Sequence, residues 1–186
     1  MATVFVFCGV GGHPGENWFP WLKTQLESRN IQAIVPAFPN TDHPILDDWI
    51  QHMAQFEKLI DQDTIFVGHS LGAAFALRLL MRMEKKIRAS FLVAPVWEVM
   101  HNEYDPLMTT FNVAPYDWET ILDHCGKFFV VQSDTDPYIK MAKSEALAKH
   151  VNAEMTVVPN AGHFNTSAGY AEFPLLRDRI LALIKN

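Results

Sequence analysis

The sequence is poor in cysteine, in basic charge and in long apolar runs. Its two cysteines, Cys8 and Cys125, are too few for the disulfide framework of a small secreted domain. Lys and Arg number 15 against 21 Asp and Glu, so the formal charge is −6 and no basic patch is available for nucleic-acid phosphates. No stretch approaches the roughly 18 apolar residues that span a bilayer, and the N-terminus shows no signal-peptide pattern. We therefore expect a cytoplasmic protein with reduced thiols, without nucleic-acid or membrane partners.

Three ligand-binding signatures are also missing. In "CGVGGHPGENW", Gly9 and Gly11 are followed by Pro14, where the dinucleotide fingerprint needs a third glycine. The chain has no Gly-Lys-Ser/Thr triplet of a Walker A loop. It also has no His-Glu-x-x-His, and its other histidines show no ligand-like spacing. We expect no nucleotide, no metal and no other cofactor.

What the chain does have is a regular alternation of apolar and amphipathic segments. Hydrophobic residues make up 49% of its 186 residues, enough for one domain with a full core. Continuous apolar runs predict buried parallel strands at Val4–Cys8, Ile31–Val35, Thr64–Val67, Ala89–Ala94, Phe128–Gln132 and Met155–Val158. Amphipathic segments predict helices at Trp18–Ser28, Leu46–Ile60, Leu71–Met83, Tyr116–Leu122, Met141–His150 and Ala171–Ile184.

This order predicts an α/β fold over residues 1–186, with about six mostly parallel strands and helices on both faces of the sheet. The segment Trp97–Pro115 has no clear pattern. It is too short for a lid domain, so we expect a single domain without a separate cap.

The stretch "TIFVGHSLGAAFALRLL" carries the most specific motif. Gly68-His69-Ser70-Leu71-Gly72 stands between a predicted strand and a predicted helix, the context of a nucleophile elbow. Side chains two residues either side of the serine would collide across so tight a turn, which explains Gly68 and Gly72. Ser70 is the predicted nucleophile.

A serine nucleophile needs a base and an acid, which follow it in this order: serine, acid, histidine. Beyond the strand at 128–132 only His150 and His163 remain, and His150 ends a predicted helix. His163 lies in a loop after the last strand, so we predict it as the base. His69 adjoins Ser70 but points elsewhere, so we interpret it as a packing or hydrogen-bonding residue.

Two aspartates compete for the role of the acid in "SDTDPYI". Asp134 stands nearest the strand end, where an aspartate often forms a local turn with its own backbone. Asp136 lies farther into the loop and is the favoured candidate. The oxyanion hole would be formed by the backbone N–H of Leu71 and that of Val10 or Gly11, and a plain tight turn is the alternative for this first loop.

The chain resembles the small, cap-less serine hydrolases of the retinoblastoma-binding-protein-9 type, a branch of the α/β-hydrolases. The resemblance covers almost the whole length and is carried by "GVGGHPGENWFPWLKTQLES", "VPAFPN", "DTIFVGHSLGAAFALRLL", "LVAPVW", "SDTDPYI" and "NAGHFNTSAGYAEFPLL". It implies Ser70 as nucleophile, Asp136 as acid and His163 as base. One departure is Cys8, where many α/β-hydrolases have histidine.

The motifs together predict a serine hydrolase that cleaves carboxylic esters, or amides or thioesters, through an acyl-enzyme. Trp18, Trp97, Met100 and Phe164 are candidates for an apolar substrate pocket and equally for the core. Two alternatives remain: a protein-interaction module with little turnover, since the name of the resembled family records a protein partner, and an acyltransferase.

Overall fold

The computed structural model describes residues 2–185, and its centre is one parallel sheet. The six strands are β1 Thr3–Phe7, β2 Gln32–Ile34, β3 Ile65–His69, β4 Ala89–Val93, β5 Phe128–Ser133 and β6 Glu154–Val158. They are ordered β2-β1-β3-β4-β5-β6, and every neighbouring pair is parallel. The predicted α/β fold with six mostly parallel strands is confirmed.

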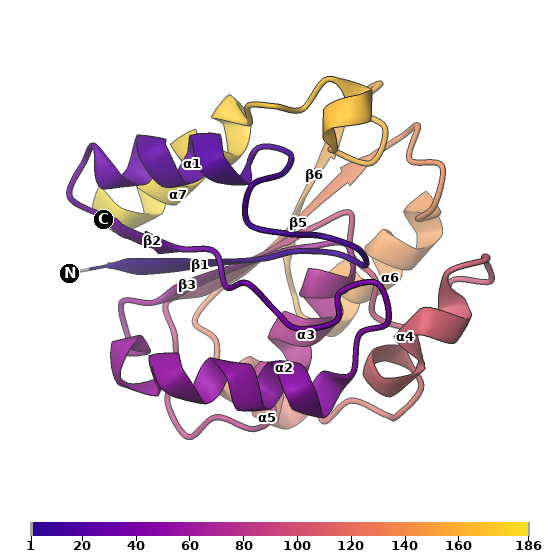
Figure 1. The fold of residues 1–186 in the computed structure, drawn as a ribbon, viewed down its shortest axis with the longest axis horizontal. Coiled ribbons are helices and arrows are strands. Elements are labelled where there is room, and N and C mark those ends of the chain that lie inside the picture. Colours follow the sequence, from indigo (N-terminus) through magenta and orange to yellow (C-terminus); the bar gives the residue numbers. More distant parts are fainter. Residues whose placement is uncertain (1, 186) are drawn as a thin grey trace.

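Helices cover both faces of this sheet (Figure 1). The α-helices are α1 Phe19–Glu27, α2 Leu46–Met53, α3 Leu71–Leu80, α4 Asp105–Asn112, α5 Trp118–Asp123, α6 Met141–His150 and α7 Pro174–Lys185. Two 3-10 segments, η1 Ala54–Leu59 and η2 Thr166–Ala168, complete the elements. Helices α1 and α7 lie together on one face, and α2, α3 and α5 lie on the other.

Burial follows the position of each strand in the sheet. All residues of β1, β3, β4 and β5 are buried, which matches their continuous apolar sequences. Strand β6, at one edge, is only half-buried. Helix α3 is buried along its whole length because the sheet lies on one side and α4 and α5 contact the other. No helix between residues 2 and 185 is long and apolar enough to cross a membrane.

The strand order reverses beside β1, and this reversal places the site. The chain leaves β1 toward β2 on one side and returns to β3 on the other. Loops that diverge in this way open a crevice at the carboxyl ends of the strands, where ligands bind in open α/β sheets. The loop after β1 contains Gly9, and the loop after β3 begins with Ser70, so the predicted oxyanion loop and the predicted nucleophile meet at this crevice.

Candidate active site

Ser70 occupies a strained turn between β3 and α3. Its backbone has φ 55° and ψ −119°, a conformation that non-glycine residues seldom adopt. Hydrogen bonds hold the turn: Ser70 N–H donates to Val93 O at 2.9 Å, and Ser70 O accepts from Val96 N–H at 3.1 Å. The sheet and the following helix therefore impose the strain, and it places Ser70 at the wall of a cavity.

The two glycines of the motif are required by close backbone contacts. A Cβ on Gly68 would lie 2.6 Å from the Cα of Ala73, inside the first turn of α3. A Cβ on Gly72 would lie 2.8 Å from Cys8 O and would also collide with Phe7 O. Real Cβ atoms do not approach backbone this closely, so the predicted steric reason for both glycines is confirmed.

Two backbone N–H groups beside Ser70 are free to bind an oxygen atom. Within residues 2–185, neither Val10 N–H nor Leu71 N–H has a hydrogen-bond acceptor. Gly11 N–H, by contrast, donates to Thr41 O at 2.7 Å. Of the two donors that the sequence left open in the first loop, Val10 is thus the one available.

His163 and Asp136 form a buried pair. The His163 Nδ1 to Asp136 Oδ2 distance is 2.9 Å, and the Asp136 side chain is fully buried while 11% of the His163 side chain is exposed. Asp136 Oδ1 accepts hydrogen bonds from the N–H groups of Tyr138 and Ile139, at 2.9 and 3.0 Å. Because a carboxylate accepts the bond at Nδ1, the neutral imidazole carries its proton there, and Nε2 is the unprotonated nitrogen.

Asp134 has a different role from the predicted local turn. Its Oδ1 accepts a hydrogen bond at 2.7 Å from Asn160 N–H, in the loop that carries His163. The predicted local turn is therefore wrong, because the Asp134 side chain binds the backbone of another loop and not that of its own. Nearby, Ser133 Oγ and Thr135 Oγ1 accept from Ala161 N–H and Gly162 N–H, at 3.0 and 3.2 Å.

The His163 loop is also held from the opposite side of the crevice. Trp18 Nε1–H donates to Phe164 O at 3.0 Å, and His69 Nε2–H donates to His163 O at 2.8 Å. Because the partner of His69 is a carbonyl, Nε2 carries the proton, and Nδ1 is a buried acceptor without a partner in the described chain. Burial and the neighbouring His163 lower the pKa of His69 to about 3, so it is neutral and serves as the predicted hydrogen-bonding residue.

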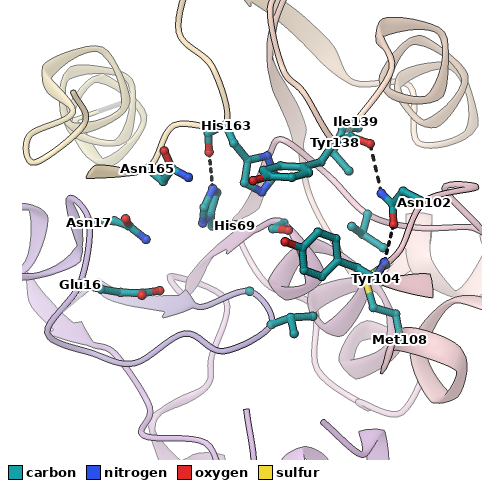
Figure 2. Close-up of a pocket in the computed structure, with 14 residues that line it drawn as sticks. Glu16, Asn17, His69, Asn102, Tyr104, Met108, Tyr138, Ile139, His163 and Asn165 are labelled. Atoms are coloured by element: carbon teal, nitrogen blue, oxygen red, sulfur yellow. Dashed lines mark hydrogen bonds between the residues drawn. The ribbon is translucent and has the colours of Figure 1, made fainter. Parts of the chain in front are cut away.

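Ser70 and His163 line the same cavity, which has a volume of about 230 Å³. Its wall is formed by Gly9, Val10, Glu16, Asn17, His69, Ser70, Val96, Asn102, Tyr104, Met108, Tyr138, Ile139, His163 and Asn165. Figure 2 shows these side chains arranged around the centre of the cavity. The Ser70 hydroxyl itself has no hydrogen bond to His163 in this structure, and such contacts often tighten only when a substrate is bound.

The four predicted pocket residues are corrected by this geometry. Trp18, Trp97, Met100 and Phe164 are all buried in the core, and none of them lines the cavity. Both indole N–H groups already donate hydrogen bonds: that of Trp18 to Phe164 O and that of Trp97 to Lys143 O, each at 3.0 Å. Of the cavity wall, only residues of the predicted catalytic centre, such as Val10, Ser70 and His163, could be found from the sequence. The other wall residues lie at or beyond the carboxyl ends of strands, which was the available signal.

Other nucleophile and metal sites find no support in the geometry. Burial raises the pKa of Cys8 and of Cys125 to about 12, so a thiolate is scarce at neutral pH. His150 ends α6, as predicted, and its ring stacks on that of Trp118 with 4.6 Å between the ring centroids. Among residues 2–185, no three His, Cys, Asp or Glu side chains are placed to hold a metal ion.

Comparisons with known proteins agree with the fold. The model of a family described as serine hydrolase matches residues 4–182. YdeN of Bacillus subtilis is 26% identical over 177 residues, which cover 94% of this chain and 92% of YdeN. The serine hydrolase RBBP9 of Rattus norvegicus is 24% identical over 160 residues, covering 86% and 84% of the two chains. The crystal structure of YdeN superposes with a TM-score of 0.95 at 24% identity, over the whole of both chains.

Proposed function

The chain belongs to the serine hydrolase family, and we propose that it cleaves carboxylic esters through an acyl-enzyme on Ser70, with His163 as base and Asp136 as acid. The observation that carries this proposal is the His163–Asp136 pair, with 2.9 Å between Nδ1 and Oδ2, whose histidine lines the same cavity as a strained serine. Amides and thioesters would react by the same steps.

In the first half-reaction, Ser70 Oγ attacks the carbonyl carbon and its proton passes to His163 Nε2. The carbonyl electron pair moves to the oxygen, which Val10 N–H and Leu71 N–H bind, and α3 directs its positive dipole end to the same point. Each such donor is worth roughly 3–4 kcal/mol in sites of this kind. Asp136 stabilises the imidazolium, and collapse expels the alcohol, which takes the proton back from His163. Water then repeats these steps on the acyl-enzyme.

Covalent labelling tests the proposal. A fluorophosphonate should phosphonylate Ser70, and peptide mass spectrometry should locate the adduct there. Ser70→Ala should abolish labelling while the melting temperature stays within a few degrees of wild type. If the wild type stays unlabelled under conditions that label a control hydrolase, the protein-interaction alternative replaces this proposal.

An alcohol or amine that outcompetes water for the acyl group would instead indicate an acyltransferase. A cytoplasmic location remains a prediction from the sequence.

A further inference from the structure

The cavity around Ser70 has two ends of opposite character. One end is mainly apolar and aromatic, and its side chains are Val96, Tyr104, Met108, Tyr138 and Ile139. Asn102 also lies at this end, but its amide already donates to Tyr138 O and accepts from Tyr104 N–H. The other end is polar, and its side chains are Glu16 and Asn17, from the loop after β1, and Asn165, from the loop after β6. Figure 2 shows the two groups on opposite sides of His163. A substrate that spans Ser70 therefore meets different chemistry on each side of its carbonyl group.

The Glu16 carboxylate is the charged group at the polar end. The side chain is half-buried and extends into the cavity beside Gly12, where a Cβ would lie 2.7 Å from Glu16 Oε1. No side chain among residues 2–185 donates a hydrogen bond to it or forms an ion pair with it. Burial raises the pKa of this carboxyl, and the charge of His13 together with a hydrogen bond from the His13 backbone opposes the effect. A half-buried carboxylate without a side-chain donor is stabilised by a donor that a ligand brings.

The two asparagines supply the complementary donors. Asn17 Oδ1 accepts from Thr166 N–H at 2.9 Å, and Asn165 Oδ1 accepts from Ala168 N–H at 3.0 Å. These bonds fix the orientation of each amide. Both NH₂ groups then face the cavity without an acceptor in the described chain (Figure 2). The polar end presents one carboxylate acceptor and two amide donors.

Adjacent hydroxyl groups match this set better than other substituents. A hydroxyl can donate to Glu16 and accept from an asparagine at the same time. A cation satisfies the carboxylate but faces two N–H donors, an anion is repelled, and an alkyl chain leaves all three groups unpaired. The volume of about 230 Å³ admits only a small molecule.

We propose that the preferred substrates are small esters with one short apolar arm and one arm bearing adjacent hydroxyl groups, and that Glu16 determines this preference. The inference rests on the proposed function and specifies the substrate class. Glu16 is the informative position because the only partner of its carboxylate within residues 2–185 is the nearby His13 of its own loop, so a substitution leaves the loop that carries His163 in place. Replacement of Asn17 or Asn165, by contrast, would also release the loop that carries His163.

The test compares matched esters. In the alcohol series, 2,3-dihydroxypropyl butanoate is paired with pentyl butanoate; in the acyl series, methyl 3,4-dihydroxybutanoate is paired with methyl hexanoate. Each kcat/KM is divided by the alkaline hydrolysis rate of the ester, which removes differences in intrinsic reactivity. The diol-to-alkyl ratio is the normalised kcat/KM of the dihydroxy ester divided by that of its alkyl partner. In whichever of the two series places the hydroxyl groups at Glu16, this ratio should be roughly tenfold lower in Glu16→Leu than in the wild type, the range of a hydrogen bond to a charged group. Glu145→Gln, an exposed position on α6, should leave the ratio unchanged.

The remaining outcomes are decisive in both directions. Glu16→Gln should accelerate cleavage of the monobutyl ester of succinic acid, whose carboxylate the wild type repels. Turnover of the alkyl esters with an unchanged ratio in Glu16→Leu overturns the inference and leaves the proposed function standing. Faster cleavage of choline butanoate than of the dihydroxypropyl ester indicates recognition by charge and also overturns it. An absence of both turnover and Ser70 labelling overturns the inference together with the proposed function.

Discussion

Asp134 and Asp136 stand two residues apart, yet their carboxylates bind in different places. Asp136 is fully buried against His163 and two backbone N–H groups, whereas Asp134 binds the backbone of Asn160 at an exposed position. Sequence reasoning favoured Asp136 from its place in the loop. It missed the partner of Asp134, because that partner lies 26 residues away, and a local motif carries no information at such a separation.

Asparagine substitutions distinguish the two residues. Asp136→Asn should leave the fold intact and lower kcat by about 10⁴-fold, because an amide can pair with the wrong imidazole tautomer. Asp134→Asn should change kcat less than about threefold, since the amide oxygen can still accept from Asn160 N–H. Ester hydrolysis rates and melting curves of both variants provide the measurement. Inactive Asp134→Asn beside active Asp136→Asn would reverse the assignment of the acid.

The buried, neutral His69 should make the free energy of unfolding depend on pH. Its pKa is about 3 in the folded protein against about 6.5 in the unfolded chain, so below pH 6.5 only the unfolded chain takes up this proton. The stability that neutral His69 contributes is complete above pH 6.5 and is lost as pH falls toward 3. Relative to His69→Gln, the free energy of unfolding of the wild type should therefore fall by about 1.4 kcal/mol for each pH unit below about 6.

Urea unfolding at intervals from pH 7 to 4.5 measures this difference. The glutamine variant keeps a donor toward His163 O and removes the titrating ring, so carboxylates that titrate in both proteins cancel. Parallel pH profiles for the two proteins would contradict a neutral, buried His69.

At the level of elements, apolar runs predicted the strands and missed one helix. All six predicted strands are present. The four inner strands β1, β3, β4 and β5 were the clearest, because a strand buried on both faces must be continuously apolar. Helix α4 lies within the segment 97–115, which the sequence left undefined. Its short length and its adjacent Thr109 and Thr110, both β-branched, weaken the helical pattern. The last helix begins at Pro174 and not at Ala171, since proline favours the first helical turn.

The junction of β3 and α3 can be tested with a pair of glycine substitutions. Gly72→Ala should lower the free energy of unfolding by about 3 kcal/mol or more and abolish fluorophosphonate labelling, because the methyl group would collide with the backbone of β1 and the residue after it. In Gly15→Ala, the added Cβ lies 3.4 Å from the His13 ring, an ordinary contact, so the free energy should change by less than about 1 kcal/mol. Chemical denaturation measures both, and equal effects would contradict the close-approach argument.

For the whole molecule, the fold class could be expected from the alternation of strands and helices and from the family resemblance, but the cavity could not. Its wall combines side chains from the loops after β1, β3, β4, β5 and β6. Which loop residues face inward depends on tertiary contacts, such as the Asn102 amide that donates to Tyr138 O at 3.3 Å. The large aromatic residues that the sequence suggested for the pocket were needed in the core instead.

The size of this cavity limits the acyl chain. Helix α4 follows Tyr104 at the apolar end, and the loop before it is tied by the Asp105 carboxylate, which accepts from Met100 N–H at 2.8 Å. We expect p-nitrophenyl acetate and butanoate to be cleaved at least about tenfold faster, in kcat/KM, than the dodecanoate, since about 230 Å³ cannot bury a long chain. The kcat/KM values are measured below the critical micelle concentration of the dodecanoate ester. A preference for the dodecanoate ester would contradict a cavity of this size.

The loop of His163 is fastened almost entirely by earlier parts of the chain. Four side chains that precede the loop in the sequence each make a hydrogen bond to it: Trp18, His69, Asp134 and Asp136. On a ribosome, these anchors are therefore synthesised before the loop that docks on them. A nascent chain holds its serine long before it holds the base, and so the hydrolytic chemistry proposed here can begin only after the last strand has joined the sheet.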